Sequence, residues 1–301
     1  MSRATETAEQ RAALRELEAR AATLPLPPGL AIDWLGVSGY RLTYEGASLF
    51  VDPYVSRVSL RELLLRKVAL PRRELVERHL RPGDDGRARV VGVLVGHTHF
   101  DHAVDAPAIC ARHDAPAYGS ASLAALMRLH GLGRLAVEVE PYRRYELGPF
   151  VVSFTPSRHS RLLFGRKVPM DGPLTCEALD GLRCGAYRCG DVYGIRIEVG
   201  GSSLYHQGSA DLIDEALRRE PVDLFLAGVA GRSVTPRYWE RVLPRLDPQV
   251  VVPTHYDDFF RPLGGELAFT AKVRLGDVPE EIAAVSRDAA VAALPRSDRP
   301  R

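Results

Sequence analysis

The chain of 301 residues is 46% hydrophobic and 26% charged, which are ordinary values for a globular protein and exclude a wholly disordered chain. Its 40 lysines and arginines nearly balance 38 aspartates and glutamates, so the composition gives no reason to expect a nucleic-acid partner. No apolar run approaches the roughly 18 residues of a membrane span, the N-terminus has no signal-peptide core, and the four cysteines do not form a disulfide framework. We therefore expect a cytoplasmic protein without a transmembrane segment.

The first 28 residues differ in pattern from the rest of the chain. Residues 5–23 carry apolar side chains at helical spacing, and Pro25, Pro27 and Pro28 follow them, so 1–28 is predicted to be a helix and a proline-rich connection. Residues 29–301 contain no repeat and no convincing linker, and we expect them to form one domain with a helical insertion at about 59–82. The N-terminal helix is expected to pack on this domain or on a second copy of the chain in a homo-oligomer.

Within that domain, short extended runs alternate with segments of helical periodicity. The run at 89–96 is continuously apolar and ends in glycine, which is typical of a strand buried on both faces. Further strands are predicted at 30–36, 40–44, 48–52, 136–140, 150–155, 192–199, 202–208, 222–230 and 249–255. Helices are predicted at 103–112, 120–130, 210–220, 236–243 and 278–293, with two short ones inside 59–82. This alternation indicates an α/β sandwich with helices on its outer faces.

The nine histidines are unevenly placed, and the densest group lies in G-H-T-H-F-D-H, directly after the apolar strand. His97 and His99 are two residues apart, so in an extended segment both imidazoles point to the same side. Asp101 and His102 follow where the chain turns into the next helix. Four nitrogen and oxygen ligands in so short a segment predict a site for a divalent metal ion.

The motif H-x-H-x-D-H resembles the signature of the metallo-β-lactamase fold family. The chain is especially similar to the branch of the ascorbate-6-phosphate lactonases and the N-acyl-phosphatidylethanolamine phospholipase D enzymes, through W-L-G-V-S-G-Y at 34–40 and F-V-D-P-Y at 50–54. The resemblance extends over roughly residues 30–262. It implies a four-layer αβ/βα sandwich with the metals at one edge, between the two sheets.

The resemblance also implies the remaining ligands. His159, in T-P-S-R-H-S-R, matches the family's third histidine, and His255, in V-V-P-T-H-Y, matches its last ligand. The first metal would then be bound by His97, His99 and His159, and the second by Asp101, His102 and His255. Asp52 resembles a buried carboxylate that orients ligand histidines from behind, although an aspartate before Pro53 is also a common turn residue.

One position departs from the family. A glycine-aspartate pair at a strand end supplies the carboxylate that bridges both metals, but the sequence Y-H-Q-G-S-A-D places Ser209 there, and a neutral hydroxyl is a weak bridge between two dications. Three outcomes follow: Asp211 replaces the missing carboxylate, only one ion is held tightly, or the site has lost its chemistry. Asp211 has the alternative role of an acidic residue in a helix's first turn, and we interpret His206 as a packed strand residue.

These residues predict a metal-dependent hydrolase that uses a metal-activated water on an ester-type bond, with a phosphodiester or lactone of an anionic small molecule as the first expectation. Asp101 would orient the nucleophile as well as ligate, and Arg158 and Arg161 would bind the anionic group unless they are solvated surface residues. Zinc is the expected metal, with one or two ions per chain, and manganese or iron also suits these ligands. The alternative function is a metal-binding sensor or partner-binding protein, non-hydrolytic because of Ser209.

The remaining chemistry-bearing group is a set of three cysteines, Cys176, Cys184 and Cys189. They contain no C-x2-C pair and no obvious fourth ligand, so free packed thiols are favoured over a metal or redox site. Cys110, on the helix after the histidine motif, is interpreted as a core residue.

Overall fold

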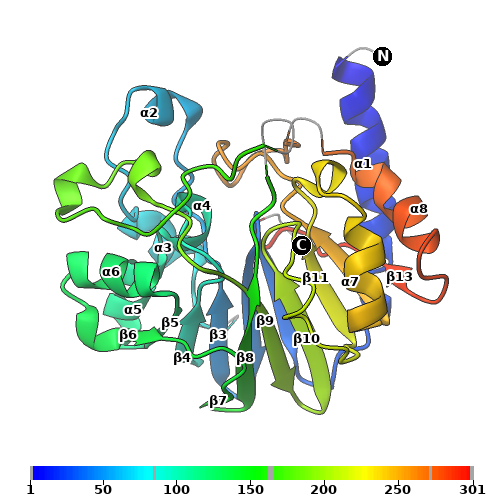
Figure 1. The fold of residues 1–301 in the computed structure, drawn as a ribbon, viewed down its shortest axis with the longest axis horizontal. Coiled ribbons are helices and arrows are strands. Elements are labelled where there is room, and N and C mark those ends of the chain that lie inside the picture. The colour runs from blue at the N-terminus through cyan, green and yellow to red at the C-terminus, as the bar shows by residue number, and fades with distance from the viewer. Residues whose placement is uncertain (1–2, 84–85, 162–165, 271–272, 299–301) are drawn as a thin grey trace.

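Two β-sheets face each other at the centre of the molecule in a computed structural model, which describes residues 3–83, 86–161, 166–270 and 273–298 (Figure 1). The first sheet has the strand order β1 (Ala31–Gly36), β2 (Gly39–Tyr44), β3 (Ala47–Val51), β4 (Arg89–Leu94), β5 (Ala117–Gly119) and β6 (Ala136–Glu138). The second has the order β13 (Ala290–Val291), β12 (Val250–Thr254), β11 (Leu224–Gly228), β10 (Ser202–Gln207), β9 (Val192–Val199), β8 (Phe150–Ser157) and β7 (Tyr145–Leu147).

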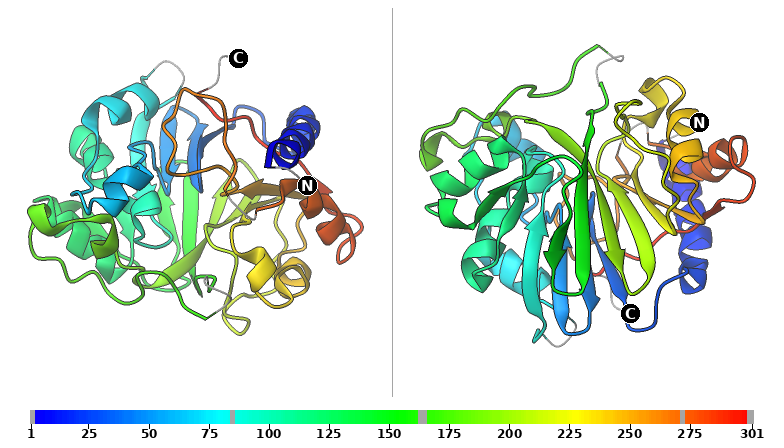
Figure 2. Two further views of the ribbon diagram at one scale, coloured as in Figure 1. Left: turned by 90° about the horizontal axis from the view of Figure 1, so that it is seen from above. Right: turned by 60° about the horizontal axis from the view of Figure 1, so that its bottom comes forward.

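Helices cover the outer face of each sheet (Figures 1 and 2). On the side of the first sheet lie α2 (Leu60–Leu64), α3 (Arg73–His79), α4 (Phe100–Ala103), α5 (Ala106–His113) and α6 (Ala121–Leu129). On the side of the second lie α1 (Arg3–Ala19), α7 (Tyr238–Leu246) and α8 (Val278–Ala283). The predicted four-layer αβ/βα sandwich of the α/β class is thereby confirmed.

The layers are held together by two apolar cores. Between the sheets, fully buried side chains such as Leu49 and Ile195 pack into one cluster. A second cluster, with Val93 and Ile109, fills the space between the first sheet and its helices. The strand β4 therefore has an apolar core on each face, as its continuous apolar sequence predicts.

The N-terminal helix α1 packs on the body of the protein. Leu14 and Leu17 are buried, the backbone N–H of Ala293 donates to the carbonyl of Leu17 at 3.0 Å, and that of Leu275 donates to Gln10 Oε1 at 2.6 Å. The sequence predicts a helix at 5–23, and α1 occupies most of that range. The hydrogen bonds to Ala293 and Leu275 join α1 to the C-terminal part of the chain. Among the described residues, no helix is long and apolar enough to cross a membrane.

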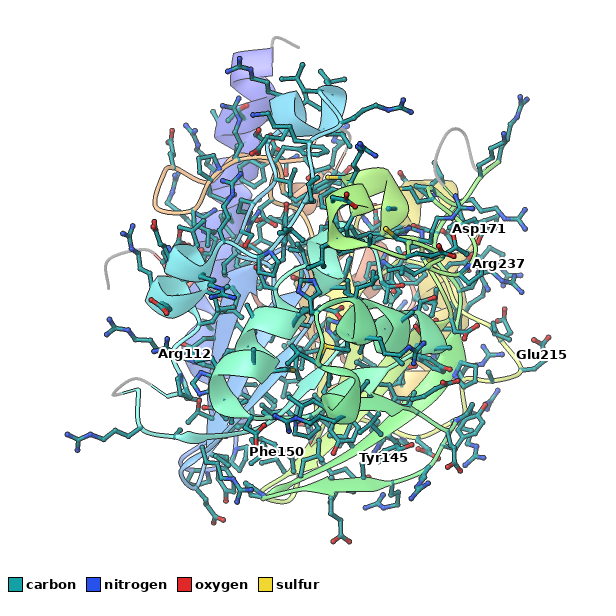
Figure 3. All side chains as sticks on the ribbon, turned by 90° about the vertical axis from the view of Figure 1, so that its left-hand side faces the viewer. Arg112, Tyr145, Phe150, Asp171, Glu215 and Arg237 are labelled. Carbon is teal, nitrogen blue, oxygen red and sulfur yellow. The ribbon has the colours of Figure 1, made fainter. Side chains whose placement is uncertain are left out.

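The prediction of a helix at 210–220 is wrong. The segment forms a single turn, from which Glu215 projects into solvent (Figure 3). Leu212 instead pairs with Ser157 in an isolated β-bridge, and the Arg241 guanidinium binds the carboxylates of Asp211 and Asp214. These long-range contacts override the local helical periodicity.

The last predicted helix, at 278–293, is too long. Only its first part is helical, as α8, which ends at Ala283. Residues 290–291 form β13, which pairs in parallel with Val250 and Val251 of β12. This strand covers an edge of the second sheet that would otherwise expose unpaired backbone groups. The short strands β5 and β7 were also not predicted.

Strand direction brings distant segments to one edge. Strands β3 and β4 are parallel, as are β10, β11 and β12, and β8 and β10 both run antiparallel to β9. The carboxyl ends of β4 in the first sheet and of β8 and β12 in the second lie at the same edge of the sandwich, because residues that follow these strands come together there. The residues that follow them include the candidate ligands.

Candidate metal centre

Two groups of three side chains gather at this edge, and each could hold a metal ion. The nitrogen and oxygen ligand atoms within each group all lie within 4.8 Å of one another. The first group is His97, His99 and His159. The second group is Asp101, His102 and His255. The rings of His97 and His102 are 3.9 Å apart between centroids, so the two groups adjoin.

In the first group, backbone carbonyls orient two of the imidazoles. His99 donates from Nε2 to the carbonyl of Pro169 at 2.8 Å, and His159 donates from Nδ1 to that of Ser160 at 2.7 Å. Each ring therefore keeps a lone pair on its other nitrogen. That of His99 Nδ1 lies within hydrogen-bond distance of His97 Nε2, at 3.1 Å. This arrangement of oriented imidazoles is typical of histidine metal ligands.

In the second group, one carboxylate oxygen lies between two imidazoles. Oδ2 of Asp101 is 3.3 Å from His255 Nε2 and 3.7 Å from His102 Nε2. His102 donates from Nδ1 to Asp52 at 2.9 Å, which leaves its Nε2 directed at Asp101. A carboxylate with two imidazoles is a donor set that suits a divalent cation.

The charges of these groups favour cation binding. Burial lowers the pKa of His97 well below its ordinary value and that of His159 to about 3, and neighbouring imidazoles add to both shifts. Burial alone would also lower the pKa of His102, but the carboxylates of Asp101 and Asp52 outweigh it and raise that pKa. Burial also lowers the pKa of His99, so the first group is neutral at pH 7. In the second group burial favours a raised pKa at Asp101, but His102 and His255 outweigh it and lower that pKa, so the carboxylate is ionised. A metal bound there would displace the proton that the raised pKa favours on His102. Both donor sets fit a divalent ion.

Asp52 lies behind the second group, where the resemblance places an orienting carboxylate. It is fully buried, and its Oδ1 accepts the backbone N–H of Gly96 at 2.7 Å while Oδ2 accepts from His102. A Cβ on Gly208 would lie 2.8 Å from Oδ2, so only glycine allows the strand end to approach this carboxylate.

Two of the site residues have backbone conformations that non-glycine residues rarely adopt. Asp52 has φ 42° and His255 has φ 60°, both in the left-handed region. The backbone N–H of His255 donates to the carbonyl of Val37 at 2.8 Å, which helps to hold this turn. Strained backbone of this kind persists where the surrounding structure fixes it, and it is enriched at functional sites.

Ser209 lies two residues after the end of β10 and belongs to neither group of ligands. Its Oγ accepts the backbone N–H of Ser160 at 3.0 Å and lies 3.2 Å from the Ser160 hydroxyl. Asp211, considered as a substitute, is directed elsewhere: its Oδ1 accepts from the Arg241 guanidinium at 3.0 Å and from the backbone N–H of Leu212 at 2.8 Å. Recruiting Asp211 to a metal would require breaking this ion pair.

The proposed anion-binding arginines lie at the surface. Arg158 and Arg161 are both exposed on the segment that carries His159, and residues 162–165 beyond them lie outside the described part of the chain. The structure thus places two cations next to the first group without fixing a substrate contact.

The cysteines are all free thiols. Cys110, Cys184 and Cys189 are buried and Cys176 is partly exposed. Burial raises the pKa of Cys184 to about 11 and that of Cys189 to about 12, so these thiols are protonated and unreactive at neutral pH. Among the described residues, no cysteine belongs to a group that could hold a metal.

The residue that sequence reasoning undervalued is His206. It lies on β10 as predicted and is fully buried, but its Nε2 is 2.9 Å from Asp52 Oδ2, the same oxygen that His102 contacts. No local signal reveals this contact, because the two residues are 154 positions apart. The carbonyl of Pro169 was missed for the same reason, since it lies 70 positions from His99. That of Ser160 is adjacent to His159 in the chain, but no sequence pattern shows that the imidazole turns back to it.

Comparisons with known proteins identify a family and a fold. A family model of the beta-lactamase superfamily domain matches residues 49–256. The chain is 31% identical over 172 residues to a UPF0173 metal-dependent hydrolase from Carboxydothermus hydrogenoformans, and this match spans 55% of the chain and 66% of that relative, just under two thirds of its length.

Solved structures with low sequence identity share the fold. The metallo-beta-lactamase fold protein YhfI from Bacillus subtilis has a TM-score of 0.54 at 16% identity, over 88% of this chain and 95% of that one. CmlA, a diiron beta-hydroxylase from Streptomyces venezuelae, has a TM-score of 0.52 at 13% identity, over 90% of this chain and 54% of its own. At these identities the likeness shows the fold alone.

Proposed function

Because the chain belongs to the beta-lactamase superfamily domain family, we propose that it is a metal-dependent hydrolase. The observation that carries the proposal is the pair of adjoining ligand groups at the carboxyl ends of the central strands. A divalent ion in such a site lowers the pKa of a bound water to about 7 and polarises the substrate oxygen. The groups of the chain bind that ion, orient the reacting water and hold the substrate beside it.

Within this activity, the finer proposals follow the residues. Asp101 is the only carboxylate in the two ligand groups of the described chain, so it is the residue proposed to accept a hydrogen bond from the attacking water. Arg158 and Arg161 are proposed to bind an anionic substrate by charge-assisted hydrogen bonds. The substrate is then a phosphodiester or lactone, as in the branch with the ascorbate-6-phosphate lactonases, and the protein acts in the cytoplasm.

The metal is proposed to be zinc, with one or two ions per chain. All-histidine and histidine–aspartate donor sets suit zinc, and they suit manganese and iron as well. Among the described residues, the only carboxylate in the two groups is Asp101, which belongs to the second. Asp211, the candidate substitute, is paired with Arg241 instead. Two ions would therefore be held by separate sets of protein ligands.

The direct test replaces two ligands at once. Alanine at both His97 and His99 should remove the metal measured by elemental analysis and abolish turnover of a phosphodiester, ester and lactone panel. The control is His113→Ala, at a half-exposed histidine of α5 outside the site, which should retain both. Full activity in metal-stripped protein would overturn the proposal.

We keep a second candidate function because of one observation. Ser209, in place of the bridging aspartate, is hydrogen-bonded to Ser160 and contributes no charge to the site. A metal-binding protein without hydrolytic activity, serving as a sensor or as a partner for another protein, would retain the ligands and lose the chemistry. Normal metal content with no turnover of any member of the panel would support this second function.

A further inference from the structure

The carboxylate of Asp52 binds two histidines, and only one of them is a candidate ligand. Oδ2 of Asp52 is 2.9 Å from Nδ1 of His102 and 2.9 Å from Nε2 of His206. Because an ionised carboxylate only accepts hydrogen bonds, both imidazoles present an N–H to it. His102 is therefore protonated at Nδ1, and His206 is protonated at Nε2.

We propose that His206 is a positioning residue for the metal centre, which acts through Asp52 to fix the tautomer and the ring orientation of His102. The proposal rests on the ligand set proposed above. His206 donates one of the two hydrogen bonds that Asp52 Oδ2 accepts. This leaves the oxygen one direction in which to accept from His102.

The surroundings of Asp52 hold its carboxylate from several sides. Its other oxygen is held by the backbone N–H of Gly96 at 2.7 Å. A Cβ on Gly208 would lie 2.8 Å from Oδ2, and one on Gly96 would lie 3.4 Å from it, so the backbone itself encloses the group. Three donors and two glycines thus fix the carboxylate, and His206 is the donor on the side of the second sheet.

His206 is itself on a rigid element. It is the next-to-last residue of β10, paired with Ile195 of β9 on one side and Leu226 of β11 on the other, and it is fully buried. Its ring packs edge-on against Tyr40, with 5.8 Å between centroids. Its Nδ1 is buried and has no hydrogen-bond partner among the described residues, so Asp52 is the group to which this ring is directed.

The consequence concerns the second ligand group. Since His102 donates from Nδ1, its Nε2 lone pair is directed at the space beside Asp101 Oδ2, 3.7 Å away, and His255 Nε2 is 3.3 Å from the same oxygen. Removing the donor at 206 would allow Asp52 and then His102 to reorient. Partners that orient a ligand histidine typically change metal affinity by about 10–100-fold.

The test compares two replacements of the same ring. His206→Phe keeps the ring volume without a donor, whereas His206→Gln keeps an N–H at a similar reach. Cobalt(II) titration against a competing chelator, followed by the visible absorption of the bound ion, should show affinity at the second group falling about 10–100-fold in H206F. H206Q should recover most of that loss, and the first group should be unchanged in both variants.

The controls separate the possible failures. His130→Phe, at a histidine outside the site that follows α6, should bind cobalt as the wild type does. His255→Ala should remove the second group's absorption; if it does not, the proposed ligand set fails, independently of His206. Wild-type affinity and absorption in H206F would overturn the role of His206.

A measurement on the unaltered protein keeps the proposal testable if H206F does not fold. In the metal-free wild type, nitrogen-15 NMR of the imidazoles should find His102 protonated at Nδ1 and His206 at Nε2. A His102 ring carrying its only proton on Nε2 would overturn the proposal.

Discussion

Replacing Asp52 by asparagine should weaken both the fold and the second ligand group. Asparagine retains one oxygen and places an NH2 group where the other stood. If its oxygen stays with His102 and His206, the NH2 group faces the backbone N–H of Gly96, which then loses its acceptor. One unsatisfied buried donor costs about 1–3 kcal/mol of unfolding free energy.

The effect on metal binding follows from the same geometry. A neutral amide oxygen holds the Nδ1–H of His102 less strongly than a carboxylate does, because the hydrogen bond is no longer charge-assisted. We expect affinity at Asp101, His102 and His255 to fall by about 10–100-fold. The assays are urea unfolding of the metal-free protein and chelator competition with cobalt or zinc.

The chain offers a matched control in Asp105. This carboxylate is also fully buried and also accepts from three donors: the backbone N–H groups of Val55 at 2.6 Å and Ser56 at 2.8 Å, and the Ser56 hydroxyl. Its hydrogen bonds reach no histidine, so Asp105→Asn should lower stability without changing metal affinity. Equal losses of metal affinity in the two variants, or none in Asp52→Asn, would refute the reasoning.

Acid should affect the contributions of the same two carboxylates to stability in opposite directions. At Asp52 burial favours a raised pKa, but His102 and His206 hold that pKa below its ordinary value, so the stabilisation by Asp52 is lost as pH falls from about 4. At Asp105 burial raises the pKa, so the contribution of Asp105 declines as pH rises above about 4. Unfolding curves of the two asparagine variants from about pH 3 to 6 should therefore deviate from the wild type with opposite slopes, and deviations of one sign would contradict this. Ser209→Asp should tighten the weaker of two zinc-binding steps in a calorimetric titration by placing a carboxylate just after β10. An unchanged titration would show that position 209 does not reach both metals. Arg57→Met should lower the free energy of unfolding by about 3–5 kcal/mol, because it leaves the fully buried carboxylate of Asp257 unpaired, and a loss below about 1 kcal/mol would show that this pair does not stabilise the fold.

The sequence predicted best where the relevant interactions are local. The segment from His97 to His102 is six residues long and follows a strand with a continuous apolar run, so the candidate ligands and the strand end could be predicted together. The sandwich follows from the same periodicities, because each buried strand and amphipathic helix carries its own pattern. His159 and His255 required the family resemblance, since nothing near either residue marks it as a ligand.

The errors lie where distant segments decide the local structure. Residues 210–220 have helical periodicity, yet Arg241, 30 positions after Asp211, binds that carboxylate and holds the segment in another conformation. Residues 290–291 form β13 because they pair with an edge of β12 that would otherwise be unpaired. His206 was correctly placed on a strand, but its contact with Asp52 depends on two sheets meeting, which no local pattern reports.

The structure also explains how the fold accommodates a serine at the position of the missing aspartate. Ser209 Oγ accepts the backbone N–H of Ser160, and Ser160 follows His159 directly in the chain. The carbonyl of the same Ser160 accepts from His159 Nδ1 at 2.7 Å, so Ser209 is linked through one residue to the third histidine of the first group. A serine at position 209 therefore supports the position of a candidate ligand through hydrogen bonds rather than through charge. The histidine donors of the first group lie together with serine at this position.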